Sequence, residues 1–156
     1  MITTNFYGLI LKFFLVLIGM ITPGIMLFWL GSKPSISEYF ESPAQFLFLL
    51  VNAGTSFYFI TTNKWLFPGV FLLLLSCFSI EYYPHIHNIV AILFFISCII
   101  SILRSYRYRS IGYLVLCMTP MIYISLFWYE YLSIILICIF HGLILQDIAK
   151  LQRFVF

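Results

Sequence analysis

Charged residues are scarce in this sequence: aspartate, glutamate, lysine and arginine make up 8% of its 156 residues. Soluble domains carry about 25%. A chain with so few charges and a mean hydropathy of +1.10 cannot cover its own surface with polar groups, so its solvent must be lipid. A soluble domain is therefore excluded, because the longest gap between apolar runs is the short stretch of residues 31–43.

Several signatures of enzymes and transporters are also missing. The sequence has no G-x-S-x-G, H-E-x-x-H or P-loop motif, and none of its four cysteines forms a C-x-x-C pair. We expect no acidic residue in the middle of a membrane span, which argues against an ion-coupled transporter or a proton pump. The N-terminal apolar run lacks a basic lead and a small-residue cleavage site, so we expect it to be retained as a span.

Six apolar runs are present, and each comes close to the roughly 20 residues that cross a bilayer as a helix. Every backbone amide in lipid must be satisfied internally, so each run is predicted to be helical. The predicted fold class is all-α, a polytopic transmembrane helical bundle that forms one domain over residues 1–156. The six predicted spans are 6–30, 44–60, 66–80, 87–103, 111–128 and 131–148.

Lysine and arginine are distributed unevenly between the two sets of loops. Threading the six spans puts seven of the eight basic residues on the side that holds both termini, and only Lys33 on the other side with all four glutamates. Basic residues in short loops mark the cytoplasmic side of a membrane. Both termini are therefore predicted to be cytoplasmic, in a multi-pass protein of the plasma membrane, taken here as the bacterial inner (cytoplasmic) membrane.

The predicted outer face gathers its polar residues in two segments. In residues 33–41, the sequence SISE is a capping-box pattern that predicts a short helix. This helix would either lie on the membrane with Ile36 and Tyr39 in lipid, or close an outward cavity. In residues 81–88, two histidines two positions apart supply half of a zinc site, or else the segment simply caps the fourth span. The outer-face candidates are Ser35, Ser37, Glu38, Tyr39, Glu81, His85 and His87.

His141 lies about ten residues into the sixth run, which places it near the middle of the membrane. An ionisable residue at that depth is a functional-site hypothesis, and the alternative is a hydrogen bond that joins two helices. Its candidate partners at similar depth are Asn52, Ser97 and Thr119. Together with His141 they form the predicted ligand-binding or pore-lining set.

Lys12 and Asp147 are predicted to lie at similar depth in the cytoplasmic half of the membrane. They are candidates for a structural ion pair, which would bring the first and sixth spans into contact. Alternatively, the Lys12 side chain extends alone to the interface.

The stretch PSISEYF at residues 34–40 resembles a Ser-Ile-Ser-x-Tyr motif of uncharacterised bacterial multi-span proteins. The His-Asn pair at 87–88, followed by Ala91 and the Phe-Phe pair at 94–95, is similar to the same group and, more distantly, to the six-span DRAM-like family. The resemblance covers about residues 30–100. It implies a six-helix membrane protein with functional interest in the outer face, and it implies no reaction, cofactor or catalytic residue.

These observations support three functional hypotheses. The first is a non-enzymatic module that binds membrane lipid or a partner membrane protein through its outer face, without a cofactor. The second is a self-associating pore, a homo-oligomer lined by the set around His141. The third is a small intramembrane hydrolase in which His85, His87 and Glu81 hold zinc to activate water. Nucleic acid is not an expected partner, because the basic loop 104–109 is better explained as an anchor to anionic lipid.

Overall fold

The computed structural model describes residues 6–62 and 64–153. This part of the chain is helical and contains no strand, so the all-α prediction is confirmed. Its elements, in chain order, are α1 (Phe6–Leu30), the 3-10 helix η1 (Ile36–Glu41), α2 (Gln45–Ile60), α3 (Leu66–Cys77), α4 (Pro84–Leu103), α5 (Arg109–Cys117), the 3-10 helix η2 (Thr119–Tyr123) and α6 (Leu126–Arg153).

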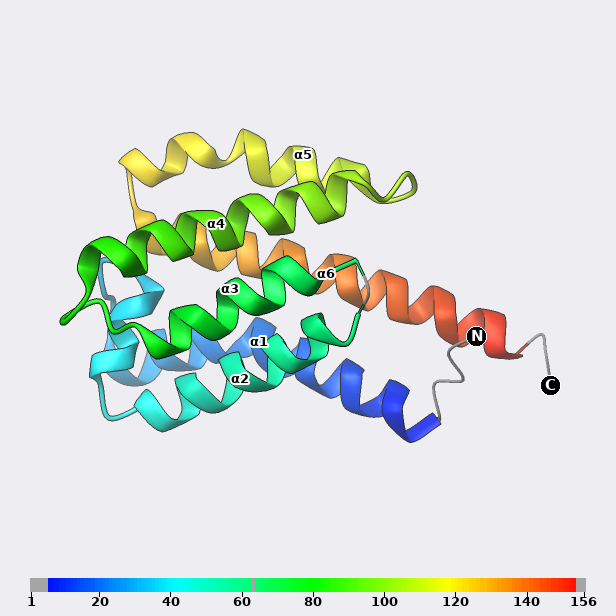
Figure 1. Ribbon diagram of the computed structural model, residues 1–156, viewed down its shortest axis with the longest axis horizontal. Helices are drawn as coiled ribbons and strands as arrows, with labels where there is room; N and C mark the ends of the chain where they lie inside the picture. Colours follow the sequence, from blue (N-terminus) through cyan, green and yellow to red (C-terminus); the bar gives the residue numbers. More distant parts are fainter. Residues whose placement is uncertain (1–5, 63, 154–156) are drawn as a thin grey trace.

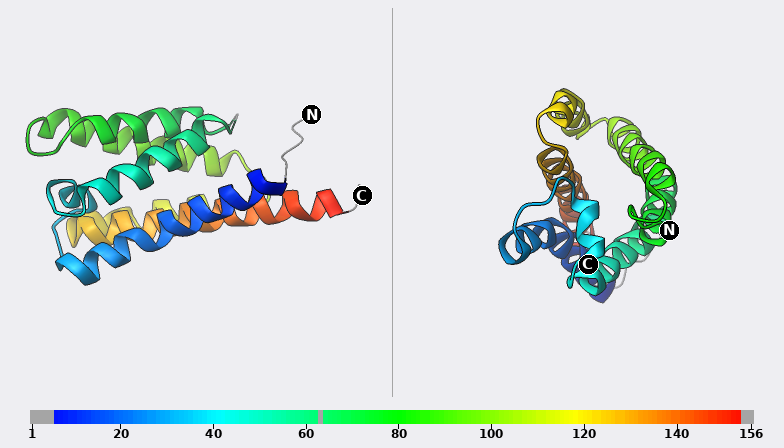
Figure 2. Two further views of the ribbon diagram at one scale, coloured as in Figure 1. Left: turned by 90° about the horizontal axis from the view of Figure 1, so that it is seen from below. Right: turned by 90° about the vertical axis from the view of Figure 1, so that its left-hand side faces the viewer.

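The helices are arranged around a ring. Consecutive helices contact each other along the chain, and α1 and α6 contact each other and so close the ring. Seen from the side, α2, α3 and α4 form one layer that faces α1 and α6 (Figure 2). α1 begins and α6 ends at the same end of the bundle, whereas η1, η2 and the turn between α3 and α4 lie at the other end, hereafter the η1 end (Figure 1).

Three helices are long and apolar enough to cross a membrane: residues 7–30 of α1, the whole of α4, and residues 126–151 of α6. α2 and α3 are also apolar but have only 16 and 12 residues, which corresponds to roughly 24 and 18 Å at 1.5 Å per residue. Large apolar side chains such as Phe14, Phe28 and Ile92 are exposed on the outside of the bundle. The structure is therefore compatible with a membrane protein, and three of the described helices are candidates to span the membrane.

The helix boundaries differ most from the predicted spans in the last third of the chain. α1 has the predicted bounds 6–30, but the predicted span 111–128 is not one helix. α5 ends at Cys117, Pro120 lies in the first turn of η2, and α6 already begins at Leu126. Proline has no backbone N–H and its ring clashes with the preceding turn, so an α-helix does not continue through this position without a kink.

η1 is held against the bundle by hydrogen bonds to three other segments. The backbone N–H of Phe127 in α6 donates to the carbonyl of Pro34 at 3.0 Å. The hydroxyl of Tyr39 donates to the carbonyl of Gly31 at 2.6 Å, and Ser79 in the α3–α4 turn donates to the carboxylate of Glu41. Burial raises the pKa of Tyr39. These three hydrogen bonds anchor η1 and the residues next to it at both ends of the segment.

The prediction that η1 lies on the membrane with apolar side chains in lipid is wrong. Ile36 and Tyr39 are buried, and they pack in a cluster with Met26 of α1 and Phe127 of α6. Ser35 stands at the predicted capping position but makes no capping hydrogen bond with its side chain. Burying two large apolar side chains in the bundle is more favourable in free energy than leaving them exposed at the membrane surface. η1 therefore packs as part of the bundle.

α2 and α3 approach each other very closely at Gly69. The hydroxyl of Ser56 in α2 donates to the carbonyl of Gly69 at 2.7 Å, and both groups are buried. A Cβ atom at position 69 would lie 2.8 Å from the backbone nitrogen of Ile60 and 2.9 Å from the carbonyl oxygen of Ser56. Only glycine therefore fits at this position without a shift of one helix relative to the other.

Candidate functional site

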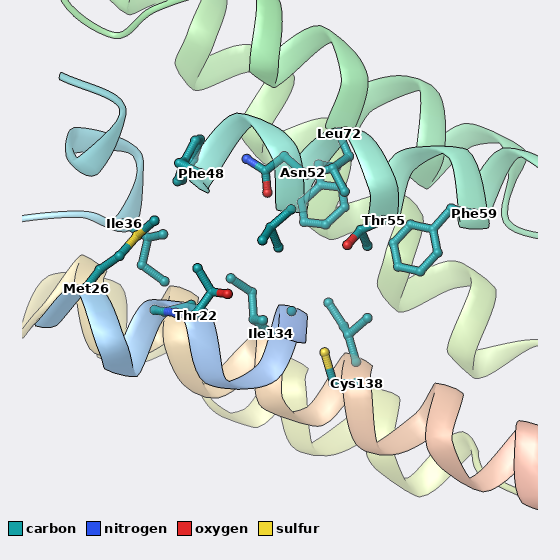
Figure 3. Close-up of a pocket in the computed structure, with 15 residues that line it drawn as sticks. Thr22, Met26, Ile36, Phe48, Asn52, Thr55, Phe59, Leu72, Ile134 and Cys138 are labelled. Carbon is teal, nitrogen blue, oxygen red and sulfur yellow. The ribbon is translucent and has the colours of Figure 1, made fainter. Parts of the chain in front are cut away.

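An apolar cavity lies inside the bundle, between the buried cluster that contains Met26 and Ile36 and a second buried cluster that contains Phe59 and Phe94. It has a volume of about 80 Å³ and is lined by side chains of α1, α2 and α6, with single contributions from α3 and α4. Ile36 of η1 closes it on one side, and Asn52 of α2 points toward it from the wall (Figure 3). Thr22, Met26, Phe48, Phe59 and Ile134 complete much of the remaining wall.

A second hollow, with a volume of about 60 Å³, adjoins the first and is more polar at its wall. Asn52 borders both spaces, while Ser37, His87 and Glu130 line only the second. The residues shared by both spaces are Ile36, Phe48, Asn52, Leu72, Phe94 and Ile134. The two spaces therefore form one mainly apolar site, whose ionisable side chains, His87 and Glu130, line the smaller space.

Glu130 is the charged residue of this site. It is the fifth residue of α6, yet only 6% of it is exposed. One carboxylate oxygen accepts a hydrogen bond of 2.7 Å from the backbone N–H of Ile36, 94 positions away in the sequence. This bond fixes both η1 and the Glu130 side chain. α6 begins five residues before the predicted span 131–148, so Glu130, expected between two spans, lies instead near the start of α6 and is buried in the bundle.

His87 contributes a free hydrogen-bond acceptor to the second hollow. It lies in the first turn of α4 and is 3% exposed. Its Nδ1 atom is 2.6 Å from the carbonyl oxygen of Phe78. A carbonyl only accepts, so Nδ1 carries a proton, and in the tautomer protonated at Nδ1 alone Nε2 keeps a lone pair. That Nε2 atom is buried and has no hydrogen-bond partner among the residues that the structure describes.

The other outer-face candidates are scattered. Ser37 lines the second hollow, and Ser35 is buried with an unpartnered hydroxyl. Glu81 and His85 are exposed at the α3–α4 turn and the start of α4. Among the residues that the structure describes, no three histidine, cysteine, aspartate or glutamate side chains lie together as metal ligands. The structure therefore does not bring His85, His87 and Glu81 together as the predicted zinc site requires.

The predicted set around His141 is not one cluster. Nδ1 of His141 lies 3.0 Å from the hydroxyl of Tyr58, a partner that the sequence did not indicate. The hydroxyl of Ser97 donates to the carbonyl of Phe94 in its own helix, and that of Thr119 donates to the carbonyl of Leu116. These two hydroxyls are satisfied locally and do not reach His141.

His141 instead lies within an aromatic cluster. Its ring stacks on Phe59 with a centroid distance of 4.8 Å, and Trp65 meets it edge-on at 4.1 Å. Phe140 and Tyr58 also contact it, at 5.5 and 5.2 Å. The ring is 1% exposed, and its Nε2 atom has no partner. This environment supports a structural role in joining α2 and α6.

The ion pair predicted between Lys12 and Asp147 is wrong. Asp147 pairs with Arg107 in the turn between α4 and α5, at 2.9 Å, and also accepts a hydrogen bond of 2.6 Å from the hydroxyl of Tyr108. This hydrogen bond raises the pKa of Tyr108. The ammonium of Lys12 lies 5.9 Å from the ring centre of Tyr58. The depth of these residues along their helices can be counted from the sequence, but the direction in which each side chain points cannot.

No family model, curated protein or solved structure matches this chain. The resemblance to multi-span bacterial proteins therefore stays a prediction, and the function is argued from the site alone.

Proposed function

We propose that this chain is an integral membrane protein that binds a lipid-like ligand inside its helical bundle, without catalysing a reaction. One observation carries this proposal: a cavity that is apolar over most of its wall adjoins a smaller hollow that a few polar side chains line, and η1 closes the cavity on one side. Ligand pockets are typically apolar with a few polar groups that orient the ligand. In a protein surrounded by lipid, the abundant molecules of that chemistry are lipids.

The proposal places all six apolar segments in the membrane. α1, α4 and α6 span it, while α2, α3 and the α5–η2 segment complete the ring at similar depth. The distribution of lysine and arginine supports cytoplasmic termini in a bacterial inner membrane, with the η1 end at the outer surface. The ligand then enters from the outer leaflet, next to η1.

The pore hypothesis has less support from the geometry. A pore requires a continuous row of polar side chains between helices or subunits. Of the four candidates, Asn52 borders the cavity, His141 lies in an aromatic cluster, and Thr119 lies in η2. They do not share one path.

Filling the cavity tests the proposed function. A Cβ atom at Gly19, on the cavity wall, would meet its nearest atoms, Sγ of Cys138 and Oγ1 of Thr55, at 3.7 and 3.8 Å, which is ordinary contact. Gly19→Leu is therefore expected to occupy the cavity with little change to the backbone. Gly142→Leu is the matched control, because its Cβ meets no atom within 4 Å.

Native mass spectrometry of protein released from mild detergent provides the measurement. We expect the wild type and Gly142→Leu to retain one lipid mass each, and Gly19→Leu to lose it. A wild type that carries no lipid, or a Gly19→Leu variant that retains as much lipid as the control, contradicts the proposal.

The orientation has its own test. Tyr82 and Tyr106 are both exposed, and they lie in the α3–α4 and α4–α5 turns at opposite ends of the bundle. Each is replaced singly by cysteine in a variant whose four native cysteines are alanine. In intact bacterial cells, a membrane-impermeant maleimide is expected to label Tyr82→Cys and not Tyr106→Cys. The reverse pattern overturns the orientation.

A further inference from the structure

The polar groups around the second hollow are mainly hydrogen-bond acceptors. Glu130 presents a carboxylate, and Nε2 of His87 presents a lone pair because the Nδ1 proton is directed to the carbonyl of Phe78. The amide of Asn52, which borders the same space, offers a third acceptor in its carbonyl oxygen. Three acceptors around a small space favour a ligand group that donates several hydrogen bonds.

The negative charge of Glu130 also favours a ligand group that donates hydrogen bonds. Within residues 6–62 and 64–153, no lysine or arginine forms an ion pair with Glu130. A buried carboxylate needs a partner of opposite charge or several hydrogen bonds, because removal from water is unfavourable for the ion. The backbone N–H of Ile36 supplies one such bond. A cation in the hollow would supply the rest.

We propose that the second hollow binds the primary ammonium headgroup of a membrane lipid, held by Glu130, His87 and Asn52. This inference rests on the proposed lipid-binding function and names the headgroup. A primary ammonium has three N–H donors, which matches the three acceptors. The hollow of about 60 Å³ accommodates roughly four atoms of the size of water, enough for an ammonium and the first carbons attached to it.

The position of the hollow favours a lipid over a soluble amine. Glu130 is four residues beyond the start of α6, roughly 6 Å along the helix, which places it just below one end of the bundle. Most of the wall of the hollow is apolar, so the two methylene groups beside the ammonium contact apolar side chains there, and the phosphodiester that follows them lies toward the η1 end and the membrane surface.

The test compares lipids that differ only in the headgroup nitrogen. Purified wild-type protein is equilibrated in mild detergent with equimolar phosphatidylethanolamine and phosphatidylcholine that have identical chains, and retained lipid is read by native mass spectrometry. The trimethylated nitrogen of phosphatidylcholine has no N–H donor. Since a hydrogen bond that involves a charged group is stronger than one between neutral groups, we expect phosphatidylethanolamine to be retained with a preference of at least roughly tenfold.

Two variants assign this preference to the hollow. Glu130→Gln keeps an oxygen that can accept the Ile36 hydrogen bond but removes the charge, so we expect the preference to disappear while total lipid retention persists. Glu81→Gln is the control, because Glu81 is exposed and does not line either space. It is expected to keep the preference. An unchanged preference in Glu130→Gln overturns the proposal.

A series of lipids tests the same inference without a mutation. Monomethylated and dimethylated phosphatidylethanolamine lose one and two N–H donors, so their retention by the wild type is expected to fall in that order. Equal retention along the series refutes the headgroup assignment but leaves lipid binding intact, whereas no retained lipid at all refutes the proposed function itself. Displacement of phosphatidylethanolamine by millimolar free ethanolamine would show a soluble-amine site and overturn the assignment to a lipid.

Discussion

Gly69→Ala is expected to destabilise the bundle, because the added Cβ meets backbone atoms as well as the side chain of Ile60. It would lie 2.8 Å from the nitrogen of Ile60 and 2.9 Å from the carbonyl oxygen of Ser56, both closer than such atoms are found. α2 and α3 must then separate by a few tenths of an ångström, which also lengthens the 2.7 Å bond from Ser56 to the Gly69 carbonyl.

The expected magnitude follows from two opposing effects. Overpacking of this kind costs about 1–3 kcal/mol, and the higher helix propensity of alanine returns up to about 1 kcal/mol. The net loss in the free energy of unfolding is thus about 0–2 kcal/mol relative to the wild type, and about 1–3 kcal/mol relative to an alanine that gains helix propensity without overpacking. For a chain of this size the loss relative to the wild type corresponds to a fall in Tm of up to roughly 8 °C.

Thermal unfolding in mild detergent, followed by circular dichroism, measures this effect. Gly142→Ala is the matched control, since its Cβ meets no atom within 4 Å and only the gain in helix propensity remains. Gly24→Ala lies between them, because the close atom there is the hydroxyl of Tyr131 at the end of a side chain that can move. A Tm of Gly69→Ala equal to that of Gly142→Ala refutes the argument from backbone contact.

The remaining predictions concern the two polar contacts of α6 away from the cavity. Tyr58→Phe removes the hydrogen-bond partner of His141 Nδ1 inside the aromatic cluster, so we expect a loss of about 1–3 kcal/mol in the free energy of unfolding, measured by denaturant titration. Phe59→Leu at the same cluster keeps that bond and serves as comparison. Arg107→Ala breaks the exposed ion pair with Asp147, and we expect a change below about 1 kcal/mol in the same titration. A larger effect than that of Tyr58→Phe would contradict this ranking.

The existence of the helices could be predicted from the sequence because runs of apolar residues determine them. The bounds of α1 were predicted exactly as observed, and α4 begins at Pro84, three residues before the predicted start, because proline is well tolerated in the first turn. The break between α5 and α6 was missed. Pro120 is the signal for this break, but the length of the apolar run 111–128 favours one continuous span.

The candidate site was less accessible to sequence reasoning. Depth along a helix can be counted from the sequence, and it placed Asn52 and His141 in the membrane. The direction in which a side chain points around the helix axis depends on which helices are neighbours, and six similar apolar runs do not encode this clearly. The pairs Tyr58–His141 and Arg107–Asp147 were missed for that reason. Glu130 was noticed as an outer acid, but its burial beneath η1 required the structure.

The contact between α1 and α6 has a consequence for the biogenesis of the protein. About 100 residues separate the end of α1 from the start of α6, and at 5–20 residues per second their synthesis takes roughly 5–20 s. In the proposed membrane topology α1 is inserted during that interval, but the helix that covers one of its faces does not yet exist. The wall of the cavity and the anchor of η1 on Glu130 are likewise incomplete until α6 arrives. Ribosomes stalled before residue 126 should therefore carry a nascent chain whose ring is open to the surrounding lipid.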